Sequence, residues 1–170
     1  VRYIGKHAFG LCDSDLFNVS DGNEYIGVPN NKYYALISAD LDRYDESHSF
    51  EMHDKTFVIA AGAFDRIEKP WFHTLAINAN VKQLPYGLLF GCEDLQQIKV
   101  HKDNPNFAAN NTGLYNKDFT KLIFATGVDQ NGKYVVADGV TTIGENAFYG
   151  NTDLKTVQLS DSVTRISAAS

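Results

Sequence analysis

The chain has 170 residues, a formal net charge of −6 at pH 7 and a sequence pI near 5.2. This acidic balance argues against nucleic-acid or anionic-membrane partners, because such surfaces are bound by clustered Lys and Arg. The longest nearly continuous apolar run, residues 57–64, is far shorter than the roughly 20 residues that cross a bilayer, so no membrane insertion is expected. Two cysteines are too few for a disulfide scaffold. The length predicts one domain with a sizeable core.

One apolar motif recurs along the chain. The pattern Val-x-x-Ile-Gly-x-x-Ala-Phe begins at Val1 and returns with identical spacing at Val140. Residues 59–64 form a third copy, in which Ala60 replaces the glycine, and residues 81–90 form a fourth that is one residue longer. Five coincident positions in two copies indicate internal repetition of one structural unit.

Each copy of the motif is followed by apolar residues spaced by three and then by two. The series are Leu16 and Val19; Phe72, Leu75 and Ile77; Leu95, Ile98 and Val100; and Leu154, Val157 and Leu159. The motif phenylalanines Phe64 and Phe90 lie 26 residues apart. This interval falls within the period of about 20–29 residues that is typical of leucine-rich repeats.

The repeat predicts a short strand, a turn and a compact irregular segment in each unit. Alternation along the last strand directs Val157 into the core and its two neighbours outward. Gly144 is expected to adopt a backbone conformation that a Cβ atom would penalise. No unit can seal its own apolar face, so neighbouring units must stack. Phenylalanines at the same phase are then expected to form one buried column, made of Phe9, Phe64, Phe90 and Phe148.

Four stretches, "IGKHAFGLC", "LLFGCEDLQQIKV", "NPNFAANNTGLYNKDFTKLIFA" and "IGENAFYGNTDLKTVQLSDSVTRI", resemble the BspA-like leucine-rich repeat family of bacterial surface proteins, which also occurs in some parasitic protists. The third stretch resembles a hairpin insertion of that family, with strands at 113–115 and 122–124 around a turn at 116–120. The resemblance implies an α/β repeat solenoid: a right-handed leucine-rich-repeat coil with a parallel β-sheet, short helical or irregular segments and a β-hairpin insertion.

The expected organisation is one leucine-rich-repeat domain over residues 1–170. Its parts are a repeat-like segment 1–20, an irregular insertion 21–55, repeats 56–103, a hairpin insertion 104–135, a repeat 136–162 and a truncated repeat 163–170. The last repeat stops before its phenylalanine, and an uncapped apolar unit is unfavourable. The chain also opens on Val1 without a signal segment. We therefore expect it to be part of a longer protein.

The resemblance implies a secreted or cell-surface protein of bacterial type whose function is non-catalytic protein binding, often adhesion. The expected partner is a host or neighbouring-cell surface protein or glycan, and the chain is expected to be a monomer without cofactor or small-molecule substrate. The predicted contact surface is a ladder of outward strand positions: Asn18, Ser20, Thr74, Ala76, Gln97, Lys99, Thr156 and Gln158. The alternative is a purely structural spacer that holds another domain away from the cell.

Four aromatic residues are further candidate contacts, because Trp and Tyr are enriched at binding hot spots. They are Trp71, Tyr33, Tyr34 and Tyr44, although each also has a plain packing explanation. The acidic and histidine-rich stretch 42–54 leaves a third alternative open, a metal-dependent binder or enzyme. Its histidines miss the spacing of a zinc helix motif, so a solvated loop is favoured. Likewise "VDQNGKY", residues 128–134, is favoured as a tight turn over a calcium loop.

No catalytic residues are expected. The chain contains no Gly-x-Ser-x-Gly nucleophile motif, no phosphate-binding loop and no dinucleotide fingerprint. Cys12 and Cys92 follow motif phenylalanines and belong to units at least two steps of about 4.8 Å apart. This separation exceeds the Cα distance of about 7 Å that a disulfide tolerates, so two free, buried thiols are predicted.

Overall fold

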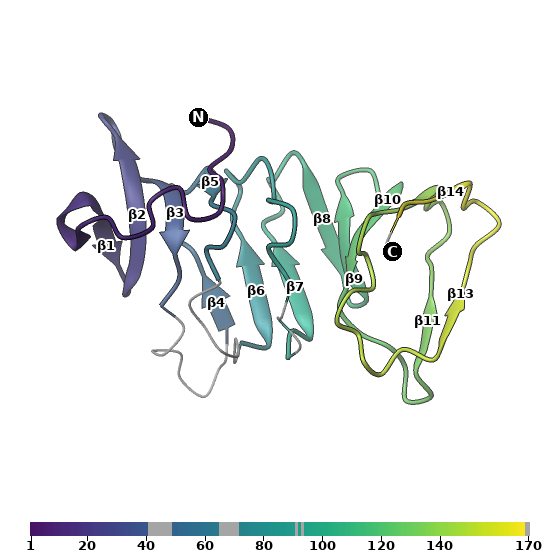
Figure 1. Ribbon diagram of the computed structural model, residues 1–170. Coiled ribbons are helices and arrows are strands. Elements are labelled where there is room, and N and C mark those ends of the chain that lie inside the picture. The colour runs from purple at the N-terminus through teal and green to yellow at the C-terminus, as the bar shows by residue number, and fades with distance from the viewer. Residues whose placement is uncertain (41–48, 65–71, 91, 93, 169–170) are drawn as a thin grey trace.

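The computed structural model describes residues 1–40, 49–64, 72–90, 92 and 94–168, and shows an elongated stack of short strands (Figure 1). The elements are η1 (Ser14–Leu16), β1 (Asn18–Ser20), β2 (Asn23–Val28), β3 (Asn31–Ser38), β4 (Ser49–Glu51), β5 (Val58–Ile59), β6 (Thr74–Ile77), β7 (Gln97–Val100), β8 (Phe107–Asn110), β9 (Gly113–Asn116), β10 (Lys121–Ala125), β11 (Lys133–Val135), β12 (Thr142–Ile143), β13 (Thr156–Gln158) and β14 (Arg165–Ile166). Within these ranges the helical content is the three-residue 3₁₀-helix η1. The helical part of the predicted α/β class is therefore not confirmed. No helix of the described part is long and apolar enough to cross a membrane.

Parallel strand pairs build the two faces of the coil. On one face β6 pairs with β4 and with β7, and β11 pairs with β13. On the other face β12 pairs with β10 and with β14, and β5 pairs with β3. Since parallel neighbours need a crossover connection, this pattern arises when a chain coils in successive turns. The predicted solenoid of stacked units with parallel sheets is confirmed.

In four of the repeated motifs the turn contains a residue at positive φ: His7 (φ 60°), Gly62 (φ 85°), Gly87 (φ 72°) and Asn146 (φ 54°). In the last three motifs it directly precedes a buried residue, namely Ala63, Leu88 or Ala147. Glycine and asparagine tolerate the left-handed region better than most residues. The strained position therefore lies two residues after the motif glycine and not at it.

Gly144 is required for a different reason than the sequence predicts. A Cβ atom on Gly144 would lie 2.7 Å from the carbonyl oxygen of Leu122 on the neighbouring rung. The amide of Gly144 also donates a hydrogen bond to that oxygen, at 2.8 Å. Close approach of two backbones, and not an unusual φ, therefore demands the glycine.

The predicted column of four phenylalanines is wrong. Phe64 is buried and Phe148 packs against the core, but Phe9 is half-buried and Phe90 is 37% exposed. The fourth motif has the standard spacing when Leu88 and Leu89 take the places of Ala and Phe, and both are buried. Phe90 then falls one residue beyond the core position and points outward.

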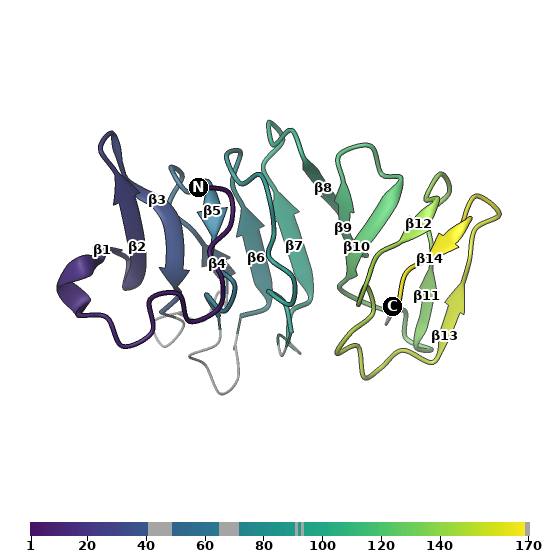
Figure 2. The ribbon, with the colours of Figure 1, turned by 45° about the horizontal axis from the view of Figure 1, so that its top comes forward.

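Antiparallel strands interrupt the coil at two places (Figure 2). Residues 21–38, expected to be irregular, hold strands β2 and β3, which pair with each other while β2 also pairs with β1. Asp21 and Gly22, both at positive φ, form the two-residue turn between β1 and β2, as Asp-Gly does in tight hairpins. Further along, β8, β9 and β10 form an antiparallel meander, which places β9 and β10 on the predicted strand segments.

Two clusters of buried side chains form the core of the described residues. The first extends from Tyr25 to Phe124, and the second from Tyr115 to Ala147. They meet at the meander, where Leu114 belongs to the first cluster and the adjacent Tyr115 to the second. The strands β8–β10 lie between β7 and β11 in both views (Figures 1 and 2).

Candidate functional site

The sheet β4–β6–β7 presents a row of outward side chains over a sealed core. Its register aligns Ser49 with Thr74 and Gln97, and it aligns Glu51 with Ala76 and Lys99. The alternate positions point inward and are buried, namely Phe50, Leu75 and Ile98. We call the six outward residues the sheet face. Four of them, Thr74, Ala76, Gln97 and Lys99, belong to the predicted contact ladder.

The remaining four predicted ladder residues do not join this row. Thr156 and Gln158 lie on β13, in a separate two-stranded sheet with β11. Asn18 and Ser20 lie on β1, which the tight turn at residues 21–22 folds antiparallel onto β2. The prediction that all eight residues form one continuous ladder is therefore wrong, because antiparallel strands interrupt the repeat on either side of β4–β6–β7.

Two of the four predicted aromatic contacts can be placed. The ring of Tyr33 stacks on His53 at 3.8 Å between ring centroids, and that of Tyr34 stacks on Phe57 at 5.5 Å. The Tyr34 hydroxyl also donates to the carbonyl oxygen of Val1. Both rings are thus partly committed to packing inside the chain. Trp71 and Tyr44 lie outside the described residues.

The acidic and histidine-rich stretch is described only from Ser49 onward, so its first part, 42–48, lies outside the described residues. His53 Nδ1 lies 2.9 Å from an Asp54 carboxylate oxygen and also accepts a bond from the Lys55 amide. Over the described ranges, no group of three or more His, Cys, Asp and Glu is arranged to hold a metal ion.

The tight turn predicted at residues 128–134 is confirmed. One Asp129 carboxylate oxygen accepts hydrogen bonds from the amides of Asn131 (2.8 Å) and Lys133 (2.9 Å). Both bonds lower the pKa of Asp129, and the bond from the Lys133 amide has the larger effect. The carboxylate therefore shapes the turn that leads into β11.

The two thiols are free, as predicted, but only Cys92 is buried. Burial raises the pKa of Cys92 to about 12, so its sulfur stays protonated at neutral pH. Cys12 is exposed because the first motif lies at one end of the stack, where fewer neighbours cover it (Figure 1). A nucleophilic role for Cys92 would require a stabilised thiolate, and its surroundings do the opposite.

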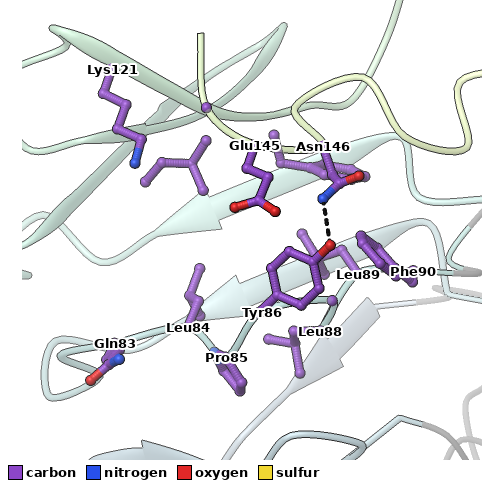
Figure 3. Close-up of a pocket in the computed structure, with 14 residues that line it drawn as sticks. Gln83, Leu84, Pro85, Tyr86, Leu88, Leu89, Phe90, Lys121, Glu145 and Asn146 are labelled. Carbon is purple, nitrogen blue, oxygen red and sulfur yellow. Dashed lines mark hydrogen bonds between the residues drawn. The ribbon is translucent and has the colours of Figure 1, made fainter. Parts of the chain in front are cut away.

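A concave pocket that the sequence did not predict opens between the segment 83–90 and the turn after β12 (Figure 3). It encloses about 360 Å³, which is within the usual range of small-ligand sites. Leu84, Leu88 and Ile123 give it an apolar floor, and Lys121 and Glu145 lie at its rim. We call it the rung pocket.

Two exposed aromatic rings, Tyr86 and Phe90, line the rung pocket, and a third, Tyr149, packs on Phe90. Tyr86 is 65% exposed, and its ring packs edge-on against Phe90 at 5.4 Å between centroids. Phe90 stacks in turn on Tyr149 at 4.2 Å. The side-chain amide of Asn146 donates to the Tyr86 hydroxyl at 2.9 Å (Figure 3). Sequence reasoning missed this cluster because it assigned Phe90 to the core; the unusual length of the fourth motif was the one indication.

The stacked parallel strands define the class: the chain is a leucine-rich-repeat solenoid. The model of the BspA type leucine-rich repeat region matches residues 130–170. Residues 130–170 therefore carry BspA-type repeat sequence, as the motif beginning at Val140 predicted.

One solved structure supports this fold. A leucine-rich repeat protein from Eubacterium ventriosum is similar at a TM-score of 0.58 and 24% identity, over 69% of this chain and 31% of that one. The pneumococcal vaccine antigen PcpA gives a TM-score of 0.47 and 18% identity, over 71% and 32%. This chain thus spans about a third of the length of either protein. Comparison with curated proteins gives no match.

Proposed function

We propose that the chain is a non-catalytic protein-binding module of adhesion type, belonging to a secreted or surface-exposed bacterial protein. The observation that supports this most is the sheet face, where six outward side chains stand in register over inward residues that are at most 2% exposed. A contact surface on a rigid support loses little conformational entropy on binding. The expected partner is a protein or glycan on a host or neighbouring cell.

The composition of the sheet face supports a protein partner. Thr74, Gln97 and Ser49 are small or flexible polar residues, and Glu51 and Lys99 add one charge of each sign. Such a surface offers hydrogen bonds and shape without a strong field of one sign, which suits contacts with another folded surface. The described strands bring no arrangement of nucleophile, base and orienting group together on this face, which is why we propose binding alone.

The test uses fluorescent beads coated with the protein and applied to epithelial monolayers and to bacterial cells. The double variant Thr74→Glu/Gln97→Glu should reduce bead adhesion at least tenfold, because two negative charges on the sheet face would be desolvated against the partner and so weaken binding by about 1.4 kcal/mol or more. Its melting temperature should shift by less than about 2 °C, since both changes are on the surface.

The matched control is Gln130→Glu/Thr152→Glu, which adds the same charge at exposed positions outside the sheet β4–β6–β7. It should adhere like the unmodified protein. Thr156→Glu tests separately whether the β11–β13 sheet contributes. Adhesion that survives in the Thr74/Gln97 variant would contradict the proposed face, and beads that never adhere would favour the spacer alternative. Adhesion that requires added calcium or zinc would favour the metal-dependent alternative.

A further inference from the structure

The rung pocket exists because one unit of the solenoid is built differently. In the units around it, a turn with a residue at positive φ follows the motif, as at residues 87–90 and 146–151. Between these two turns the chain forms the meander β8–β10 and returns to β11 through the short segment 126–132. In the segment 126–132, which the structure describes completely, no such turn directly follows β10, and the pocket lies between the turns at Gly87 and Asn146.

The aromatic wall of the pocket is held in a fixed position. The Tyr86 hydroxyl is bonded to the Asn146 amide, and Asn146 is itself 7% exposed and at positive φ, so it has little freedom. Phe90 packs against the Tyr86 ring in a T-shaped arrangement. A ring that is 65% exposed and held both at its hydroxyl and by a neighbouring ring is a platform for a flat apolar ligand face.

The rim adds polar groups of complementary kinds. Gln83, Lys121 and Glu145 are exposed residues of the pocket lining, and they supply an amide, an ammonium group and a carboxylate. Within the described part of the chain, the polar ends of these three side chains make no hydrogen bond or ion pair, so all three can bind a ligand. Together they offer both donors and acceptors around the apolar floor.

A sugar ring meets these requirements together. One face of a hexose consists of C–H groups, which pack on an aromatic ring, and its edge carries hydroxyls that donate and accept hydrogen bonds. A protein side chain would use the apolar floor but would leave the rim groups unpaired on binding, which is costly. The opposite charges of Lys121 and Glu145 favour a neutral ligand. We propose that the rung pocket is a binding site for a neutral glycan residue.

The test is saturation-transfer difference NMR of the whole chain with four methyl glycosides: those of β-galactose, α-mannose, α-fucose and N-acetyl-β-glucosamine. At least one should receive saturation, with a dissociation constant in the millimolar range. Tyr86→Ala should abolish that transfer. Tyr86→Phe should weaken binding only several-fold, because the ring is retained but its bond to Asn146 is lost. Lys121→Ala should also weaken it. Tyr3→Ala, which removes an exposed ring elsewhere, should bind like the unmodified chain.

Two outcomes would overturn the proposal: no transfer to any of the four glycosides, or transfer that is unchanged in both Tyr86→Ala and Lys121→Ala. N-acetyltyrosinamide is included as a side-chain probe, and its binding in place of the glycosides would assign the pocket to a protein anchor. Circular dichroism verifies that each variant is folded. The rung pocket and the sheet face share no residue, so the Thr74/Gln97 variant should retain glycoside binding, and either proposal can fail alone.

Discussion

Asn104 lies directly below Asn78 in the stack of turns and repeats its bonding. The Asn104 side-chain amide donates to the carbonyl oxygens of Asn78 (2.8 Å) and Val81 (3.0 Å), and its oxygen accepts from the amides of Asn106 and Phe107. The Asn78 side chain does the same one unit earlier, donating to the carbonyls of His53 and Thr56. Each asparagine thus joins its own turn to the turn before it.

Replacing Asn104 should be strongly destabilising. The residue is fully buried, and Asn104→Ala leaves two carbonyls and two amides without their partner. We expect the free energy of unfolding to fall by about 2–4 kcal/mol, measured by urea denaturation. The control Asn111→Ala, at an exposed position, should change it by less than about 0.5 kcal/mol. Equal effects of the two substitutions would contradict the structural role of Asn104.

Gly144→Ala should destabilise the stack although its φ is ordinary. The added methyl group would lie 2.7 Å from the Leu122 carbonyl oxygen, so β10 and β12 would have to separate. An expected loss is about 1–3 kcal/mol in the same denaturation assay. Gly127→Ala is the matched control, because a Cβ there meets nothing within 4 Å. If both alanines were neutral, the rungs would be less closely packed than described.

The assignment of Leu89 to the core position of the fourth motif can be tested against Phe90. Leu89 is 7% exposed, so Leu89→Ala should cost about 2–4 kcal/mol through lost burial and a cavity. Phe90→Ala removes a larger side chain, yet it should cost less because the ring lies on the surface against Tyr149. Thermal unfolding, monitored by circular dichroism, compares the stability of the two variants. The reverse order would restore the phenylalanine column.

Alkaline pH should destabilise the second core cluster through Tyr134. Burial, and then the hydrogen bond with Tyr115 at 3.1 Å between hydroxyl oxygens, raises the pKa of Tyr134 above the ordinary tyrosine value of about 10. The unfolded chain therefore releases this proton at lower pH than the folded one, so stability is lost as pH rises above about 10.

The measurement is urea denaturation between pH 8 and pH 11. The slope of stability against pH should be smaller in Tyr134→Phe, which has no proton to lose at this position. Tyr149→Phe, on an exposed tyrosine, should keep the slope of the unmodified protein. Identical slopes for all three proteins would show that Tyr134 ionises equally in the folded and unfolded chain.

The repeat period and the strand positions were predictable because identical spacing at like phases reflects identical packing. Leu75, Ile98 and Val157 are inward strand residues as expected from alternation. The fourth motif was misaligned because Leu89 and Phe90 are both apolar, and the match to the other motif phenylalanines was given more weight than identical spacing. Asn78 and Asn104 lie 26 residues apart, the same interval as Phe64 and Phe90. The pair was missed because only apolar residues were aligned, and asparagine is more often a surface residue.

The candidate site was less predictable for a physical reason. Which strands lie beside each other depends on hydrogen bonding between distant segments, and the contact ladder assumed that every unit places its strand in one sheet. The turn at Asp21-Gly22 and the meander β8–β10 break that assumption. The rung pocket depends on the turn that this unit lacks, and such a missing element leaves no motif to find.

The division of the core at β9 affects how the molecule loses its structure. Leu114 and Tyr115 are neighbours in the chain but pack into different clusters, so β9 separates the two halves of the core. Besides contacts such as Tyr86–Asn146 and Phe90–Tyr149, the two clusters are linked through β9. Mechanical pulling from either terminus should therefore unfold the cluster nearer that terminus first, while the other cluster stays folded.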